Sequence, residues 1–205
     1  MSDERKAQIV EAARQLYEEK GLARTSVKDI SERCGIARSL FYHYFPDKQA
    51  VTSAVIDDFI ADYIELLQFW NEQRTPGNIE EALDGVVRVL RVGVFENSNF
   101  RQAIDTCENA ALNLEFLNRV ADRTATYFIE TTVRDYAQAH PVKIDHVYET
   151  FYVLIMGICM YIRTHRDVSN EVLKDIIAQT LHMQRGGKNN ETPPHPNNAA
   201  LTGQA

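Results

Sequence analysis

The sequence predicts an all-α protein of about nine helices. None of the six prolines interrupts a segment of helical apolar periodicity: Pro46, Pro76 and Pro141 fall between such segments, and the others lie in the last 20 residues. Runs rich in Val, Ile and Thr with alternating polarity are absent, and no Asn-Gly or Asp-Gly pair joins two such runs. The chain is therefore expected to fold as separate helical rods without a β-sheet.

Caps and glycines place the first helices. A helix over about 3–20 has Ile9, Ala12, Ala13 and Leu16 on one stripe and stops at Gly21. Thr25 or Ser26 can cap a short helix over about 27–34, which ends at Gly35. A second short helix over about 37–44 ends before Pro46.

The remaining helices are longer. One is expected from Asp47 to about Gln73, a length of roughly 40 Å. Further segments are expected near 79–96, 99–110, 114–140, 143–165 and 169–185. The expected domains are a helix-turn-helix domain at 1–46 and a larger helical domain at 47–185. The polar, Pro- and Asn-rich segment 186–205 is expected to be a disordered tail.

Composition excludes several classes of protein. The N-terminus has no apolar run typical of a signal peptide, and the longest apolar stretch, 151–162, is too short for a membrane span of about 18–20 residues. Cys34, Cys107 and Cys159 show no C-x-x-C spacing and are expected to be reduced thiols. Cys34 in particular is expected to be a small core residue. We therefore expect a soluble, cytoplasmic protein with no membrane partner.

Signatures of catalysis and of metal binding are missing. Dinucleotide, P-loop, zinc-protease and nucleophile-elbow motifs do not occur, and no two histidines are spaced i, i+4. The sequence thus predicts no enzyme activity, no cofactor and no metal site.

The net charge of −7 argues at first against a nucleic-acid partner. The charge is unevenly distributed, however: residues 1–50 carry nine Lys and Arg against eight Asp and Glu, whereas residues 51–205 carry thirteen against twenty-one. The acidity belongs to the second part of the chain, so it leaves the first 50 residues free to bind DNA.

The segment 26–48 predicts a helix-turn-helix. Ile30, Ile36, Phe45 and either Leu40 or Phe41 supply the apolar contacts between the two short helices. The outward side of 37–44 presents Arg38, Ser39, Tyr42 and His43, which can donate hydrogen bonds in a major groove. Lys28 can reach the groove, and Lys48 can meet a phosphate. Double-stranded DNA is therefore the expected partner.

The pattern GIARSLFYHYFPDK at 35–48 resembles the signature of the TetR (tetracycline repressor-like) family of bacterial transcriptional regulators. The segments TSVKDI at 25–30 and IVEAARQLY at 9–17 are similar to that family as well, and the resemblance covers about residues 5–51. It implies base contacts from Lys28, Arg38, Ser39 and His43, and phosphate contacts from Thr25, Ser26, Tyr42, Tyr44 and Lys48.

Two positions depart from the family pattern. Ala37 stands where a serine often caps the recognition helix, so this helix lacks a cap worth about 1 kcal/mol. Leu40 stands where Thr or Ser often meets the DNA backbone. Leu40 either packs inward or touches a thymine methyl group, and the sequence leaves both alternatives open.

The larger domain carries many aromatic residues. The stripe Phe59, Tyr63, Leu66 and Trp70 on the long helix, facing Val86, Val89, Leu90 and Val94, is most simply a helical core. The resemblance implies that this region also encloses an effector pocket, suited to an apolar or aromatic small molecule. Its candidate walls are Phe59, Tyr63, Trp70, Phe116, Tyr127, Phe128, Tyr152 and Met156. Asp105, Cys107 and Glu108 could add polarity nearby, although a solvated helix end explains them equally simply.

The run 151–162 is apolar on every face of a helix, so both sides must be covered. Together with the amphipathic helix at 169–185 it predicts a four-helix interface with a second copy, where Gly157 allows close approach. The resemblance also implies a homodimer, through about 143–185.

These features predict a homodimeric regulator, more specifically a repressor that binds a palindromic operator and is released by a small effector. The switch is expected to run through the helix at 47–73. One alternative is a helix-turn-helix regulator controlled by a partner protein and lacking a small-molecule pocket. Alternatives of another class are an all-α enzyme and a purely structural dimer.

Overall fold

The computed structural model describes residues 2–75, 77–95, 99–106, 109–137 and 143–185. These residues form helices and no strand, which confirms the predicted all-α class. The order is α1 (Ser2–Lys20), α2 (Val27–Arg33), α3 (Arg38–Tyr44), α4 (Lys48–Gln73), α5 (Ile79–Phe95), α6 (Asn99–Ile104), α7 (Ala110–Phe128), a π-helical segment (Ile129–Val133), α8 (Arg134–Ala137), α9 (Val147–Thr164) and α10 (Asn170–Thr180). Because α7, the π-helical segment and α8 are continuous, the described residues make nine rods, the number expected.

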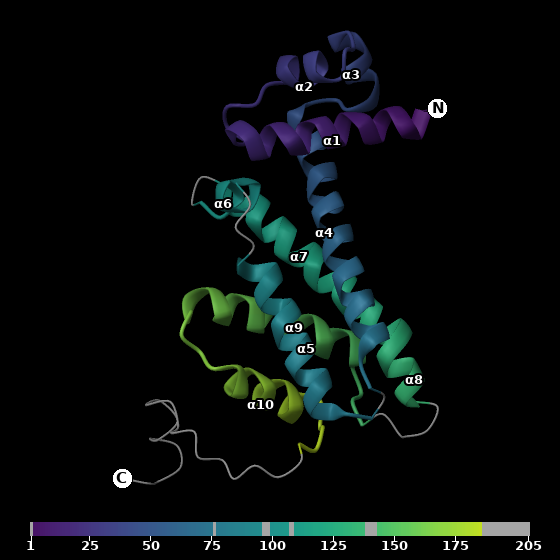
Figure 1. Ribbon diagram of the computed structural model, residues 1–205, viewed down its shortest axis with the longest axis vertical. Coiled ribbons are helices and arrows are strands. Elements are labelled where there is room, and N and C mark those ends of the chain that lie inside the picture. The colour runs from purple at the N-terminus through teal and green to yellow at the C-terminus, as the bar shows by residue number, and fades with distance from the viewer. Residues whose placement is uncertain (1, 76, 96–98, 107–108, 138–142, 186–205) are drawn as a thin grey trace.

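Helices α1 to α3 form a small head, and the long α4 runs from it into the larger domain (Figure 1). The head is built around Ile9, Ala13, Tyr17, Ile30 and Phe41, which are fully buried. The short α2 and α3 cannot be stable alone, so packing holds them in place: α2 packs against α1, and α3 packs against α2. Gly21 and Gly35 follow α1 and α2 with φ of 84° and 63°, a backbone conformation that glycine adopts without a steric penalty.

The buried stripe of α4 differs by one residue from the predicted one. Leu67 is buried, whereas Leu66 is 37% exposed, so the expectation that Leu66 belongs to the core stripe was wrong. Phe59, Tyr63 and Leu67 form an i, i+4 row that packs inward. Leu66 lies about 100° away from Leu67 around the helix, on the solvent side.

Several predicted helix ends were also wrong, and side-chain and backbone caps explain two of them. Helix α6 stops at Ile104 rather than near 110. The Asn109 side chain donates a hydrogen bond at 2.8 Å to the carbonyl of Ala103, in the last turn of this helix. Helix α10 stops at Thr180 rather than 185, because Met183 N–H bonds back to the Ala178 carbonyl at 2.8 Å. Helix α9 begins at Val147, four residues later than expected, and α7 begins at 110 rather than 114.

Other expectations lie outside the described residues. These are the disordered tail at 186–205, the last part of the helix expected to reach 140, and the roles suggested for Cys107 and Glu108. Among the described residues, no helix has the length and apolar character needed to cross a membrane.

Candidate nucleic-acid interface

Helix α2 begins with a reciprocal cap. Ser26 Oγ accepts a hydrogen bond from Asp29 N–H at 3.2 Å, and the Asp29 carboxylate accepts one from Ser26 N–H at 2.7 Å. Lys20 Nζ lies 2.9 Å from the same carboxylate. The hydrogen bonds from Ser26, and then the one from Lys20, hold the pKa of Asp29 well below its usual range. Of the two predicted caps, Ser26 is the one used.

Helix α3 begins without a side-chain cap. Ala37 is the N-cap residue and offers only its carbonyl, which accepts hydrogen bonds from Leu40 N–H at 3.0 Å and Phe41 N–H at 3.3 Å. Phe41 is the single residue of α3 that is buried, and its ring contacts that of Phe45 at 5.9 Å between centroids. Helix α3 is therefore anchored by one aromatic ring and leaves most of its surface to solvent.

One side of α3 is an exposed surface, which we call the reading face. It consists of Arg38, Ser39, Leu40, Tyr42 and His43, all exposed. Tyr42 is 53% exposed, with its ring edge-on to Phe41. The structure thus brings together the four predicted groove residues of α3 on one solvent-facing surface. It also places Leu40 on the surface, so the alternative that Leu40 packs inward was wrong.

The other residues predicted to contact DNA differ in how far they are exposed. Lys28 is exposed on α2, with its Nζ 3.6 Å from the carboxylate of Glu32. Thr25 lies inside the head, 2% exposed, and its hydroxyl donates to the Gly21 carbonyl at 3.0 Å. Its side chain is therefore occupied within the fold, which does not favour the predicted phosphate contact. Tyr44 is half-buried, edge-on to His43.

Lys48 stands at the first turn of α4 and bonds to the loop that follows α1. Its Nζ donates to the Leu22 carbonyl at 2.6 Å. Burial lowers the pKa of Lys48, and the nearby charge of Asp29 opposes this shift. Because an ammonium group has three donors, one bond to Leu22 leaves capacity for a phosphate.

The family model described as "Bacterial regulatory proteins, tetR family" matches residues 9–55, the region that folds as the head and the first turns of α4. Residues 9–55 therefore form a TetR-type region. It is 45% identical over 58 residues to the HTH-type transcriptional regulator EthR of Mycolicibacterium smegmatis, covering 28% of this chain and 27% of that protein. It is 38% identical over 96 residues to the probable HTH-type transcriptional regulator ArpR of Pseudomonas putida, covering 46% of this chain and 42% of that protein.

The matches to these two relatives therefore span less than half of the relatives' length. Solved structures extend the likeness of fold. A TetR-family regulator from Streptomyces coelicolor aligns over 89% of this chain and 98% of its own, with a TM-score of 0.59 and 18% identity. RolR in complex with resorcinol aligns over 89% of both chains, with a TM-score of 0.56 and 18% identity. The curated relatives are named as regulators and not as enzymes, in line with the prediction of a non-enzyme.

In this fold the eight candidate pocket residues fall into separate groups. Trp70, Tyr127 and Phe128 form one aromatic cluster, in which Phe128 also contacts Phe151, a residue that sequence reasoning missed. Tyr63 and Trp70 pack on the backbone of α5 at Gly93 and Gly85, where a Cβ atom would overlap their rings. That these aromatic residues line an effector pocket therefore stays a prediction.

The remaining candidates lie elsewhere. The rings of Phe59 and Phe100 stack near the head, with 5.0 Å between their centroids. The centroid of the Phe116 ring lies 3.9 Å from the guanidinium carbon of the buried Arg101. Tyr152 is half-buried and donates to the Asn118 carboxamide at 3.0 Å in a surface depression between α7 and α9. Met156 is half-buried against the core.

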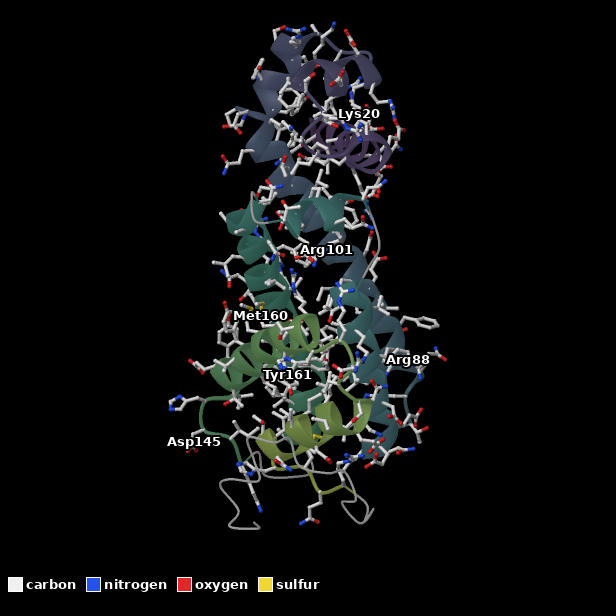
Figure 2. All side chains as sticks on the ribbon, turned by 90° about the vertical axis from the view of Figure 1, so that its left-hand side faces the viewer. Lys20, Arg88, Arg101, Asp145, Met160 and Tyr161 are labelled. Carbon is white, nitrogen blue, oxygen red and sulfur yellow. The ribbon has the colours of Figure 1, made fainter. Side chains whose placement is uncertain are left out.

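An apolar groove lies between α9 and α10. Val153, Leu154, Gly157, Ile158, Tyr161 and Ile176 are among the residues that line its volume of about 610 Å³. Val153 is 66% exposed, and a Cβ at Gly157 would meet nothing within 4 Å. Figure 2 shows Met160 and Tyr161 on the same helix, on the body of the molecule away from the head. This groove falls within the region predicted to form the dimer.

Sequence reasoning missed the joint between the head and helix α6. Tyr17 stacks on Phe100 at 5.5 Å, and Phe100 in turn stacks on Phe59 of α4. Glu18 accepts hydrogen bonds from the first backbone N–H groups of α6. Arg101, the neighbour of Phe100, lies beneath the head at the junction with the larger domain (Figure 2). No motif marks these contacts, because the α1 residues and their α6 partners are more than 80 residues apart in sequence.

Proposed function

We propose that this chain is a DNA-binding transcriptional repressor that acts as a homodimer and responds to a small apolar or aromatic effector. The observation that carries the proposal is the exposed reading face of α3, held by the buried Phe41 on a head that matches the TetR family. A helix of this width fits the major groove, and its Arg, Ser, Tyr and His side chains can hydrogen-bond to bases and phosphates.

Dimerisation is expected to use α9 and α10. The exposed Val153 and Met160 and the groove beside Gly157 form an apolar surface that a second copy of this chain would cover. The two copies would then place their reading faces in successive major grooves about 34–36 Å apart on a quasi-palindromic operator.

The effector is expected to bind in the larger domain near the aromatic cluster of Trp70, Tyr127 and Phe128. A solved neighbour of similar fold, RolR, is a complex with resorcinol, which supports a small aromatic ligand. Two structural connections link this region to the head: α4, which carries both Lys48 and Trp70, and α6, whose Phe100 stacks between Tyr17 and Phe59.

Selection of bound fragments from genomic DNA, followed by titration at several salt concentrations, tests the DNA-binding proposal. The expected result is enrichment of a quasi-palindromic site whose affinity falls with salt, as phosphate neutralisation requires. Failure to enrich any fragment would favour a structural dimer without DNA binding.

Thermodynamic linkage between effector binding and DNA binding tests the proposed response to an effector. A small molecule that releases the operator must bind less tightly to the DNA-bound dimer than to the free dimer, by the same factor by which it weakens DNA binding. Equal affinity for both forms would refute the switch and favour control by a partner protein. Turnover of a substrate would revive the enzyme alternative.

A further inference from the structure

Leu40 is an apolar residue at one edge of the reading face. Its side chain is 38% exposed, and its backbone N–H is bonded within α3 to the Ala37 carbonyl. The residue that follows, Phe41, is fully buried and fixes how α3 turns in the head. Successive helical residues point about 100° apart, so Leu40 is directed to one flank of the helix and away from the core.

Ala37 shares this flank, because residues three apart lie on the same side of a helix. Both are exposed, and neither side chain can form a hydrogen bond. The exposed His43, three residues after Leu40, continues the same flank. The surface around Leu40 is thus an apolar strip of a methyl and an isobutyl group, bordered by polar side chains.

A single exposed leucine is ordinary on a protein surface. Leu40 needs an explanation because it lies on the reading face. The base edges in the major groove present hydrogen-bond donors and acceptors, with one apolar exception, the C5-methyl group of thymine. A leucine placed against a polar base edge would remove water from that edge without replacing its hydrogen bonds. Contact with a thymine methyl has no such cost.

We propose that Leu40 is a specificity-determining residue that packs against the C5-methyl group of a thymine in each operator half-site, with Ala37 beside it. This inference rests on the proposed DNA-binding function, and its test separates the two.

The experiment uses the full-length protein and the operator fragment obtained by selection. Each thymine of a half-site is replaced in turn by deoxyuridine, which removes the methyl group and keeps every hydrogen-bonding atom. Affinity is measured at fixed salt for the wild type, for Leu40→Ala and for Leu66→Ala. Leu66 is a matched control because it is 37% exposed and lies on α4 in the larger domain.

The expected result is that one thymine position per half-site loses about fourfold in affinity on replacement by deoxyuridine, the effect of one buried methyl-sized group. The same replacement should change the affinity of Leu40→Ala by less than about twofold, whereas Leu66→Ala should respond like the wild type.

Two results would overturn the inference while leaving the proposed function intact: affinity insensitive to deoxyuridine at every thymine, or the same loss in the wild type and Leu40→Ala. The first result requires no protein variant, so it does not depend on how Leu40→Ala folds. Absence of any selected operator would overturn both the inference and the proposed function.

Discussion

Glu18, at the end of α1, accepts a hydrogen bond from the backbone N–H of Asn99 at 2.8 Å, so that a carboxylate of the head caps the first turn of α6. The second oxygen of the same carboxylate accepts from Phe100 N–H at 3.1 Å. The Asn99 side chain donates in return to the Glu18 carbonyl. The negative charge also suits the positive end of a helix. Head and larger domain are therefore joined by polar bonds beside the Tyr17–Phe100 stack.

Replacing Glu18 by alanine should destabilise the protein by about 1 kcal/mol, the usual cost of losing a helix cap. It should also weaken the coupling between effector and DNA, because α6 would no longer be tied to α1. Urea unfolding measures the first effect. Operator affinity with and without effector measures the second.

Glu19→Ala is the matched control. Glu19 pairs with Arg33 at 2.5 Å within the head, on the exposed side, and makes no bond to α6 that would link the domains. Its replacement should leave the coupling unchanged. Equal coupling between effector and DNA binding in Glu18→Ala and Glu19→Ala would show that the Glu18 cap does not transmit effector binding to the head.

The missing cap of α3 can be supplied. Ala37→Ser should stabilise α3 by roughly 0.5–1 kcal/mol, since the serine hydroxyl can accept a hydrogen bond from the first turn. Ser26→Ala should destabilise α2 by a similar amount, because it removes one half of the reciprocal cap with Asp29. Hydrogen exchange of the α2 and α3 amides measures both changes. Unaltered protection of α3 in Ala37→Ser would mean that the added hydroxyl does not reach the helix end.

Arg38 and Lys48 should differ in what they contribute to binding. Arg38→Ala should reduce the discrimination between operator and random DNA by about 1–3 kcal/mol, because a base-reading side chain is lost. Lys48→Ala should weaken binding to both DNAs about equally, because its partner is a phosphate. Titrations with both DNAs at one salt concentration compare the variants. An operator preference that survives Arg38→Ala would remove Arg38 from the base-reading set.

The sequence predicted the rods of this fold well because prolines and glycines mark where helices cannot continue. Gly21 and Gly35 adopt the positive φ that their positions after α1 and α2 suggested. The uncapped start of α3 at Ala37 was also predicted correctly. These features depend on residues close together in the chain, where local backbone chemistry decides the outcome.

Features that depend on distant residues were predicted less well. Leu66 and Leu67 are both leucines, so composition could not decide which of them faces the core; the packing of α4 against other helices decides it. The cap of Glu18 on α6 and the stack of Tyr17 on Phe100 join residues that share no motif. The reading face was predicted because its residues lie on one short helix with one buried anchor.

Two glycines, one closely packed and one with open space beside it, test the packing of α5 and the dimer interface. Gly85→Ala would place a Cβ 1.6 Å from the Trp70 indole nitrogen, so a loss of roughly 1–3 kcal/mol is expected even though alanine favours helix. Gly157→Ala meets nothing within 4 Å in one chain and should stabilise the monomer by up to about 1 kcal/mol.

The same Gly157→Ala change should weaken the dimer, because the predicted interface needs close approach at that position. Urea unfolding at fixed protein concentration and analytical ultracentrifugation measure the two effects separately. An unchanged dimer affinity in Gly157→Ala would argue against an interface through this part of α9.

Stability should depend on acid through the ion-pair network between α5 and α10. Glu171 lies 2.7 Å from Lys174 Nζ and accepts a hydrogen bond from Arg185 at 2.7 Å. The bonds from Lys174 and then Arg185 lower the pKa of Glu171 to about 2 from its usual 4.5. A carboxylate with a lowered pKa in the folded state stabilises the fold above its unfolded pKa and loses this contribution as the pH falls.

The free energy of unfolding should therefore decline between about pH 4.5 and pH 2 as Glu171 is protonated, and Glu171→Gln should show a smaller decline over that window. Glu72→Gln, at an exposed position near the end of α4, should follow the wild type. Urea unfolding at fixed protein concentration from pH 2.5 to pH 7 measures all three proteins. If Glu171→Gln and wild type declined in parallel, Glu171 would contribute nothing to acid sensitivity, and Glu80, a carboxyl group of the same network whose pKa is also lowered, would be the next residue to test.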